Sequence, residues 1–310
     1  MDAPGDISCG ERHAERASRR LVGLMSAATA SHVAPYLLWL FPMAVFQFAD
    51  ILGFTVPCEW AAPVYAVKSL LCAILIVWLK PWRHYAPGGA SVESRKSKVR
   101  SPNETTVQPS NRQTVKLSGR QTDGKSRGLA IGVSAGLAVA ALWILPETPW
   151  LFSKVSGFVS VYNRWLIMPP GDFPDYFRPD IFPALPERHP SLAYAPWVCG
   201  WVFTICKLLG SAFVISAAEE WFFRGFLYRW LRKGDFLSVD LARYDAQTFW
   251  LVVLVFGLEH DRWLAGMMAG AVYGWLVLRT GRIGPAIIAH ATTNLALGIY
   301  VVLSRQYGFW

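Results

Sequence analysis

Long apolar runs with almost no charge constrain the fold of this 310-residue chain more than any other feature. Runs of about 20 residues match the hydrocarbon thickness of a bilayer, because a helix rises ~1.5 Å per residue and lipid offers irregular backbone no hydrogen-bond partners. We therefore predict an all-α, polytopic integral membrane protein of about seven or eight transmembrane helices. The expected spans are 33–54, 60–79, 129–146, 196–231 (an entry segment plus one span), 248–260, 264–280 and 283–303.

Tryptophan placement agrees with this prediction. Several of the 15 Trp, including Trp60, Trp78 and Trp150, stand near the ends of expected spans, where aromatic side chains form belts at headgroup level. The alternative is that the runs are core helices of a large soluble protein, which would need amphipathic covering helices. The sequence shows none.

Positive charge is concentrated between Lys80 and Arg127, a segment with eleven Lys or Arg against three acidic residues. By the positive-inside rule this loop is cytoplasmic, and the basic N-terminus lies on the same side. We interpret the net charge of +9 as an orientation signal and expect a lipid bilayer, not a nucleic acid, as the partner.

Composition divides the chain into four parts. Polar and basic residues without aromatics indicate a disordered linker, whereas the Pro-rich and aromatic stretch that follows the third span indicates an ordered extracytoplasmic loop. The expected organisation is two transmembrane helices in 1–85, a basic cytoplasmic linker in 86–128, one transmembrane helix and the ordered loop in 129–195, and a catalytic helical core in 196–310.

Ionisable residues at membrane depth mark function by default, because they are costly in lipid. At ~1.5 Å per residue, Glu220, His260 and His290 come to similar depths on three helices, roughly 12–18 Å from the cytoplasmic ends. The residues expected at this depth are Glu219, Glu220, Arg224, Glu259, His260 and His290, with Asn294 beside them.

Glu220 and Arg224 are four residues apart, so they share one helix face and are expected to form a structural ion pair. Glu219 lies about 100° around the helix and has no such partner. This division suggests Glu219 as a general base that faces a polar cavity. The alternative is that both glutamates sit at a membrane interface without a chemical role.

Peptide hydrolysis inside a membrane needs a water molecule, a base, and donors to the oxyanion that develops on the scissile carbonyl. Glu219 with His260 is expected to orient and deprotonate the water, while His290 and Asn294 donate to the oxyanion. Alternatively, Glu219, His260 and His290 hold a Zn²⁺ ion whose bound water ionises near neutral pH. The sequence has no HExxH motif.

Two glycine patterns need separate interpretations. Gly266, Gly270 and Gly274 recur every fourth residue, a pattern that lets transmembrane helices approach closely. The segment GVSAG around Ser134 matches the serine-nucleophile pattern, but that motif requires a strand-to-helix turn and a His/Asp pair. We therefore expect no catalytic serine at this position.

Together these residues resemble the CPBP family of CAAX proteases and bacteriocin-processing intramembrane endopeptidases. The family motifs EExxxR, FxxxH and HxxxN occur in order, with Phe256 as the first residue of FxxxH. The resemblance covers about 196–303 and implies a CAAX-type bundle. It also implies an endopeptidase with the roles given above for Glu219, His260, His290 and Asn294, with or without a metal.

The segment FRPDIFPALPE and the C-terminal sequence also resemble the CAAX prenyl protease-related subgroup associated with exosortase (PEP-CTERM) protein sorting. This narrower resemblance implies a multi-pass protein of the bacterial inner membrane. It also implies a membrane-associated peptide or protein substrate, and exosortase components as possible partners. The long linker and the N-terminal third have no motif support.

Two other functions remain open. A catalytically silent membrane protein could bind a peptide or act as an immunity or assembly factor, but it would not need to keep all four candidate catalytic side chains. A proton-coupled transporter would need charges along a path through both leaflets, whereas the outer halves of these helices read as uncharged.

Overall fold

The computed structural model describes residues 26–54, 58–85, 118–166 and 190–310, and all regular secondary structure in these ranges is helical. The predicted all-α class of a polytopic membrane protein is therefore confirmed. The predicted parts of the chain at 1–25, 55–57, 86–117 and 167–189 lie outside the described residues.

The first half of the chain contributes four helices of the described structure. Helix α2 contains two internal prolines, Pro35 and Pro42. Helix α5 has Pro149 in its first turn, and Leu151 N donates a capping hydrogen bond to the Thr148 hydroxyl oxygen. The bounds are α2 Ala27–Ile51, α3 Ala61–Leu79, α4 Ser118–Ile144 and α5 Pro149–Trp165, with short 3₁₀ turns at Cys58–Trp60, Pro81–Tyr85 and Leu145–Glu147.

The second half forms one long helical stretch followed by three helices. The stretch from Pro196 to Arg232 has a kink at Gly200 and then alternates between α-helix and π-helix. Its parts are α6 Pro196–Leu209, η5 Gly210–Ile215, α7 Ser216–Glu220, η6 Trp221–Leu227 and α8 Tyr228–Arg232. After it come α9 Ala246–Leu258, α10 Trp263–Thr280 and α11 Gly284–Ser304, with 3₁₀ turns at Pro190–Tyr194, Phe236–Ser238 and Tyr307–Phe309.

Every expected span coincides with a helix, but not all are long and apolar enough to cross a bilayer alone. Among the described residues, 5 helices meet both criteria: Ala27–Phe46, Ala61–Leu79, Ser126–Glu147, Pro196–Arg232 and Gly284–Ser304. Helix α9 is apolar but has only 13 residues. Helix α10 has 18 residues and many small side chains. The total of seven or eight spans therefore stays a prediction.

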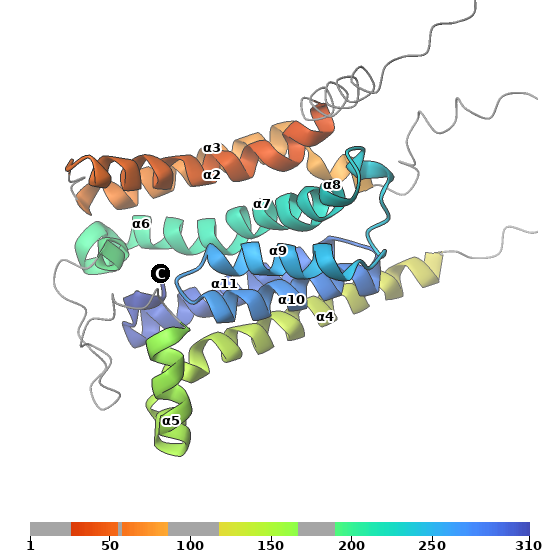
Figure 1. Ribbon diagram of the computed structural model, residues 1–310. Helices are drawn as coiled ribbons and strands as arrows, with labels where there is room; N and C mark the ends of the chain where they lie inside the picture. The colour runs from red at the N-terminus through yellow and green to blue at the C-terminus, as the bar shows by residue number, and fades with distance from the viewer. Residues whose placement is uncertain (1–25, 55–57, 86–117, 167–189) are drawn as a thin grey trace, which may run out of the picture.

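The long helices lie side by side in layers (Figure 1). Helices α2 and α3 pack together and cover one face of the α6–α8 stretch, while α9, α10 and α11 lie on its other face with α4 outermost. Helix α11 makes its most extensive contact with α4, and α9 with α10. Helix α5 projects away from the bundle. We call the end where α6 begins and α11 ends the C-terminal end of the bundle.

Glycines set the closest helix contacts. A Cβ atom at Gly266 would lie 3.1 Å from Gly257 Cα, and one at Gly274 would lie 2.8 Å from the Phe249 ring. The predicted close approach along this glycine stripe is thus confirmed, with α9 as the partner. The glycines of GVSAG serve the same purpose on α4, because a Cβ at Gly132 would meet Pro285 O at 2.9 Å.

Two predicted segments differ from what is observed. Helix α4 begins at Ser118, inside the predicted linker 86–128, so its last residues are helical. Helix α5 occupies the start of the stretch predicted as an ordered loop after the third span. Arg262 bonds to Glu147 at the end of α4 and donates to Gly308 O at 2.9 Å. These contacts join α4, the α9–α10 loop and the last residues at the C-terminal end of the bundle.

Candidate active site

The EExxxR motif lies where the long α6–α8 stretch changes its helical register. Glu219 and Glu220 end α7, between the π-helical segments η5 and η6. A π-helical turn rotates the side chains that follow it, and such turns are frequent at functional sites. The two carboxylates diverge as their spacing predicts, because the Glu220 side chain is fully buried while that of Glu219 is 13% exposed.

Glu220 is held from two sides. Arg224 Nη1 lies 2.8 Å from Glu220 Oε1, and Arg224 Nη2 donates to Gly270 O on α10 at 2.9 Å. The guanidinium also stacks over the Phe256 ring, 4.4 Å from its centroid, a favourable contact for a desolvated cation. Phe256 of the FxxxH motif therefore packs against the ion pair.

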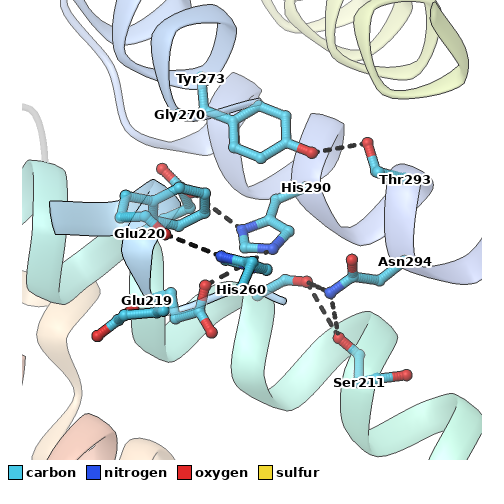
Figure 2. A network of polar contacts seen from close by, with 12 residues as sticks. Ser211, Glu219, Glu220, His260, Gly270, Tyr273, His290, Thr293 and Asn294 are labelled. Carbon is cyan, nitrogen blue, oxygen red and sulfur yellow. Dashed lines mark hydrogen bonds and ion pairs between the residues drawn. The ribbon is translucent and has the colours of Figure 1, made fainter. Parts of the chain in front are cut away.

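His290 connects the two carboxylates (Figure 2). Its Nδ1 lies 3.0 Å from Glu220 Oε1, and its Nε2 lies 3.7 Å from Glu219 Oε2. The ring is buried and stacks on Tyr273 at 4.8 Å between centroids. Because an ionised carboxylate only accepts hydrogen bonds, Glu220 fixes a proton on Nδ1 and directs Nε2 toward Glu219.

His260 approaches the same place from the end of α9. Its Nδ1 lies 2.8 Å from Phe256 O, a carbonyl that only accepts, so Nδ1 carries a proton. Its ring contacts Phe256 at 5.0 Å and Trp143 of α4 at 5.4 Å between centroids. In the neutral ring, Nε2 is then an acceptor that can bind a proton of water.

One cavity of about 520 Å³ receives Glu219, His260, His290 and Asn294 together. Glu219 Oε2 is buried and makes no hydrogen bond with any of the described residues. A buried carboxylate oxygen without a protein partner is costly unless it meets water, a proton or a ligand. The cavity also extends to residues at the C-terminal end of the bundle, among them Tyr194, Arg262 and Phe309.

Asn294 differs from its expected geometry. Its Nδ2 donates to Ser211 O at 2.9 Å and to Ser216 Oγ at 3.1 Å, so both amide hydrogens are used (Figure 2). These bonds fasten α11 to the π-helical segment η5 and to the first residue of α7. The role of an oxyanion donor would require Asn294 to release one of them.

Metal binding by these side chains finds no support in the arrangement. Among the described residues, no group of three or more His, Cys, Asp or Glu side chains could hold a metal ion. His260 points its Nδ1 at a backbone carbonyl, and His290 binds Glu220 through its Nδ1. Glu219, His260 and His290 therefore do not form a zinc site in this conformation, and we derive no step through one.

The cavity contains charged residues that the sequence analysis missed. These are Lys68 of α3 and Lys207 of α6, which line it together with Glu259, a residue that was expected at this depth and that accepts a hydrogen bond from Tyr36. The expectation that the outer halves of the helices are uncharged was therefore wrong. A single Lys inside each apolar run was the available signal, because any ionisable residue at membrane depth is a candidate for function.

The comparison with known families falls on this part of the chain. Residues 197–296 match the family model described as "Type II CAAX prenyl endopeptidase Rce1-like". This segment is similar to that family. No curated protein and no solved structure gives a significant match to the chain.

The matched segment runs from the start of α6 into α11 and contains every residue of the three motifs. It does not contain the whole cavity, because Trp39 of α2, Lys68 of α3 and Trp143 of α4 complete the walls. The helices before the matched segment therefore shape the space in front of the motif residues.

Proposed function

We propose that this protein is an intramembrane endopeptidase that hydrolyses a peptide bond of a membrane-associated protein or peptide. The observation that carries the proposal is the single cavity that holds Glu219, His260 and His290, with Glu219 Oε2 buried and without a hydrogen bond to any described residue. The match of residues 197–296 to the Rce1-like family supports it, since the name of that family describes CAAX prenyl endopeptidases.

Water activation falls to Glu219 in this proposal. The carboxylate takes a proton from a water molecule that His260 Nε2 orients, and the water oxygen forms a bond to the scissile carbonyl carbon. The proton then passes from Glu219 to the leaving nitrogen as the C–N bond breaks, which leaves a carboxylic acid, with the second water proton, and an amine. Glu219 returns to its starting state.

Oxyanion stabilisation falls to the opposite side of the cavity. With both ring nitrogens protonated, His290 keeps Nδ1 on Glu220 and offers Nε2 as a donor toward the developing negative charge. Asn294 can join it only by giving up a bond to η5. We therefore assign the larger share of this stabilisation to His290, and to Asn294 mainly the positioning of α11.

The substrate and surroundings remain proposals. The spans favour a multi-pass protein in a lipid bilayer, and the basic clusters favour a cytoplasmic N-terminus. A bacterial inner membrane is what the exosortase-associated resemblance implies. The segments FRPDIFPALPE and NLALGIYVVLSRQYGFW keep an exosortase-associated role as a narrower proposal. Neither Zn²⁺ nor a prenyl group on the substrate is needed for the steps above.

A catalytically silent binding, immunity or assembly factor is the second candidate. This candidate is less consistent with the structure, because Glu219 Oε2 is buried without a hydrogen bond to the described residues. A binding protein would gain nothing from the free-energy cost of such an oxygen. Lys68 and Lys207 support the transporter alternative, because they add charged groups to the cavity. A transporter would also need charges along the path beyond Arg224, where the next cavity is small and lined mainly by apolar side chains.

Cleavage of co-expressed candidate substrates in membranes tests the proposal. Glu219→Gln and His260→Ala should each lower the cleavage rate by about 10²–10⁴-fold, the typical contribution of a positioned acid or base. Glu59→Gln is the matched control, because it makes the same chemical change at an exposed carboxylate. Unchanged cleavage in both site variants would refute these roles.

A further inference from the structure

Two lysines stand at the cavity wall with no role in the proposed chemistry. Lys68 is buried and Lys207 is partly buried, and both line the cavity that contains Glu219. At ~1.5 Å per residue, Lys68 lies roughly 10 Å along α3 from its first residue, and Lys207 lies roughly 10 Å along α6 from the kink at Gly200. Both are therefore deep inside candidate membrane spans.

Neither lysine has a counter-ion in the described part of the chain. The contacts of Lys68 Nζ are the rings of Trp39 at 4.3 Å and Tyr65 at 5.0 Å. Those of Lys207 Nζ are the rings of Tyr65 at 4.2 Å and Tyr194 at 4.6 Å. Cation–π contacts recover part of the lost hydration, but buried charges are ordinarily paired with an anion. The expected anion has to come from outside these contacts.

The geometry brings both ammonium groups to one place. They share the ring of Tyr65, and Trp39 and Tyr194 wall the same part of the cavity. Two cations among aromatic rings suit a single oxyanion that is attached to apolar groups. A free polyanion would meet the apolar walls without benefit.

The subsite is continuous with the candidate active site. Lys207 and Glu219 belong to the same helical stretch and line the same cavity. Their separation along the helix is roughly 18 Å at ~1.5 Å per residue, which about five extended peptide residues would span. A peptide bound with its scissile carbonyl at Glu219 can therefore reach the lysines.

We infer that Lys68 and Lys207 form a specificity subsite that binds a carboxylate side chain of the peptide substrate, several residues from the scissile bond. The inference rests on the proposed endopeptidase function, because it is the substrate peptide that connects the two parts of the cavity. The pair thus selects apolar segments with one acidic residue over segments that are entirely apolar.

Binding measurements test this subsite without requiring chemistry. The full chain in phosphatidylcholine nanodiscs is titrated with labelled, end-capped apolar nonapeptides that carry one glutamate at each successive position, and with their glutamine counterparts. At one position or more, the glutamate peptide should bind at least about tenfold more tightly. Lys68→Gln and Lys207→Gln should each remove most of this ratio, and Lys207→Arg should retain it.

Lys233→Gln is the control, because Lys233 is exposed at the far end of the same helical stretch. Thermal unfolding of each variant checks the fold, and removal of a desolvated charge should not lower the melting temperature. A ratio near one at every position, or a ratio that survives both glutamine changes, overturns the inference. The inference is also overturned if the lysine variants weaken the binding of glutamate and glutamine peptides equally, because the lysines would then not recognise the carboxylate.

Two further arms distinguish a peptide carboxylate from a lipid phosphate, and binding at the lysines from hydrolysis at Glu219. If the lysine variants change only the binding of phosphatidylglycerol, the anion is a lipid phosphate and the peptide subsite is refuted. Glu219→Gln should preserve the glutamate preference in binding while it abolishes cleavage. Should the preference depend on the lysines while cleavage is absent from the wild type, the proposed hydrolysis fails and the subsite stands.

Discussion

Two buried polar networks lie on the same helical stretch, and they differ in how completely their atoms are paired. The active-site network joins Glu220, Arg224 and His290. The second network joins His32 of α2, Tyr85 and Arg229: Tyr85 Oη lies 2.6 Å from His32 Nε2 and accepts from Arg229 Nη2 at 2.8 Å. Each network thus contains a histidine and an arginine that lie within candidate membrane spans.

The second network is closed. His32 Nδ1 lies 2.7 Å from Ala28 O, and Arg229 Nε donates to Gly225 O at 2.7 Å, so each ring nitrogen of His32 has a partner. The active-site network is open, because Glu219 Oε2 and Glu220 Oε2 make no hydrogen bond with any of the described residues. A buried histidine alone therefore does not indicate an active site. Carboxylate oxygens beside it that make no hydrogen bond are the better indication.

Replacement of His290 or His32 with alanine should give the largest difference in cleavage rate between the two networks. His290→Ala should lower cleavage by about 10²–10³-fold, since it removes the main donor to the developing oxyanion. His32→Ala should leave cleavage within a few-fold of the wild type when normalised to folded protein, although it costs stability. Cleavage assays on equal amounts of folded variant decide between them. Equal losses would show that the closed network also serves the chemistry.

The ion pair should dominate stability in the open network. Arg224→Ala leaves the buried Glu220 carboxylate without its cation, and loss of one partner of a buried pair costs about 3–5 kcal/mol. Glu219→Gln should cost far less, because that side chain lies at the cavity, where its Oε2 makes no hydrogen bond with the described residues and only a 3.7 Å contact with His290 Nε2. Folded yield and thermal unfolding in detergent measure the difference. Equal yields would contradict a structural role for the Glu220–Arg224 pair.

Each network is also bordered by a glycine, and the two should respond differently to a methyl group. A Cβ at Gly136 would lie 2.4 Å from Ala289 O, whereas one at Gly225 would meet Tyr85 Oη at 2.8 Å and His32 Cδ2 at 2.9 Å. Backbone yields less than side-chain ends, so Gly136→Ala should destabilise by up to about 3 kcal/mol.

Gly225→Ala should cost less than Gly136→Ala, and part of its cost is offset by the better helix propensity of alanine. Melting temperatures of the two variants provide the comparison. A larger loss for Gly225→Ala would mean that the closed network is the more rigid of the two. It would also weaken the view that Gly132 and Gly136 are the closest packing contacts of α4.

The sequence predicted those features that depend on spacing within one helix. The i to i+4 spacing of Glu220 and Arg224 predicts their shared face, and the divergence of Glu219 follows from the same geometry. The stripe of Gly266, Gly270 and Gly274 predicts a close helix neighbour. Local periodicity is enough for such features, and the order of the motifs then suggested which helices meet.

Features that depend on contacts between helices could not be predicted. Nothing in the spacing of HxxxN indicates that both amide hydrogens of Asn294 bond to Ser211 and Ser216, because these two residues are brought together by the π-helical segment η5 that ends between them. Nor does a single Lys in each of α3 and α6 reveal that one tyrosine ring lies beneath both. The closed network likewise depends on a residue, Tyr85, that follows α3 by a short turn.

The smallest expected effect concerns that tyrosine. Tyr85→Phe removes one hydroxyl that accepts from Arg229 and contacts His32, and loss of such a bond costs about 1 kcal/mol in net stability. Because Arg229 retains its bond to Gly225 O, the helix should keep its position and cleavage should not change. Tyr244→Phe is the control, since Tyr244 is 56% exposed. Thermal unfolding should separate the two variants by a few degrees, whereas a tenfold loss of cleavage in Tyr85→Phe would place the closed network within the catalytic machinery and remove the distinction between the two networks.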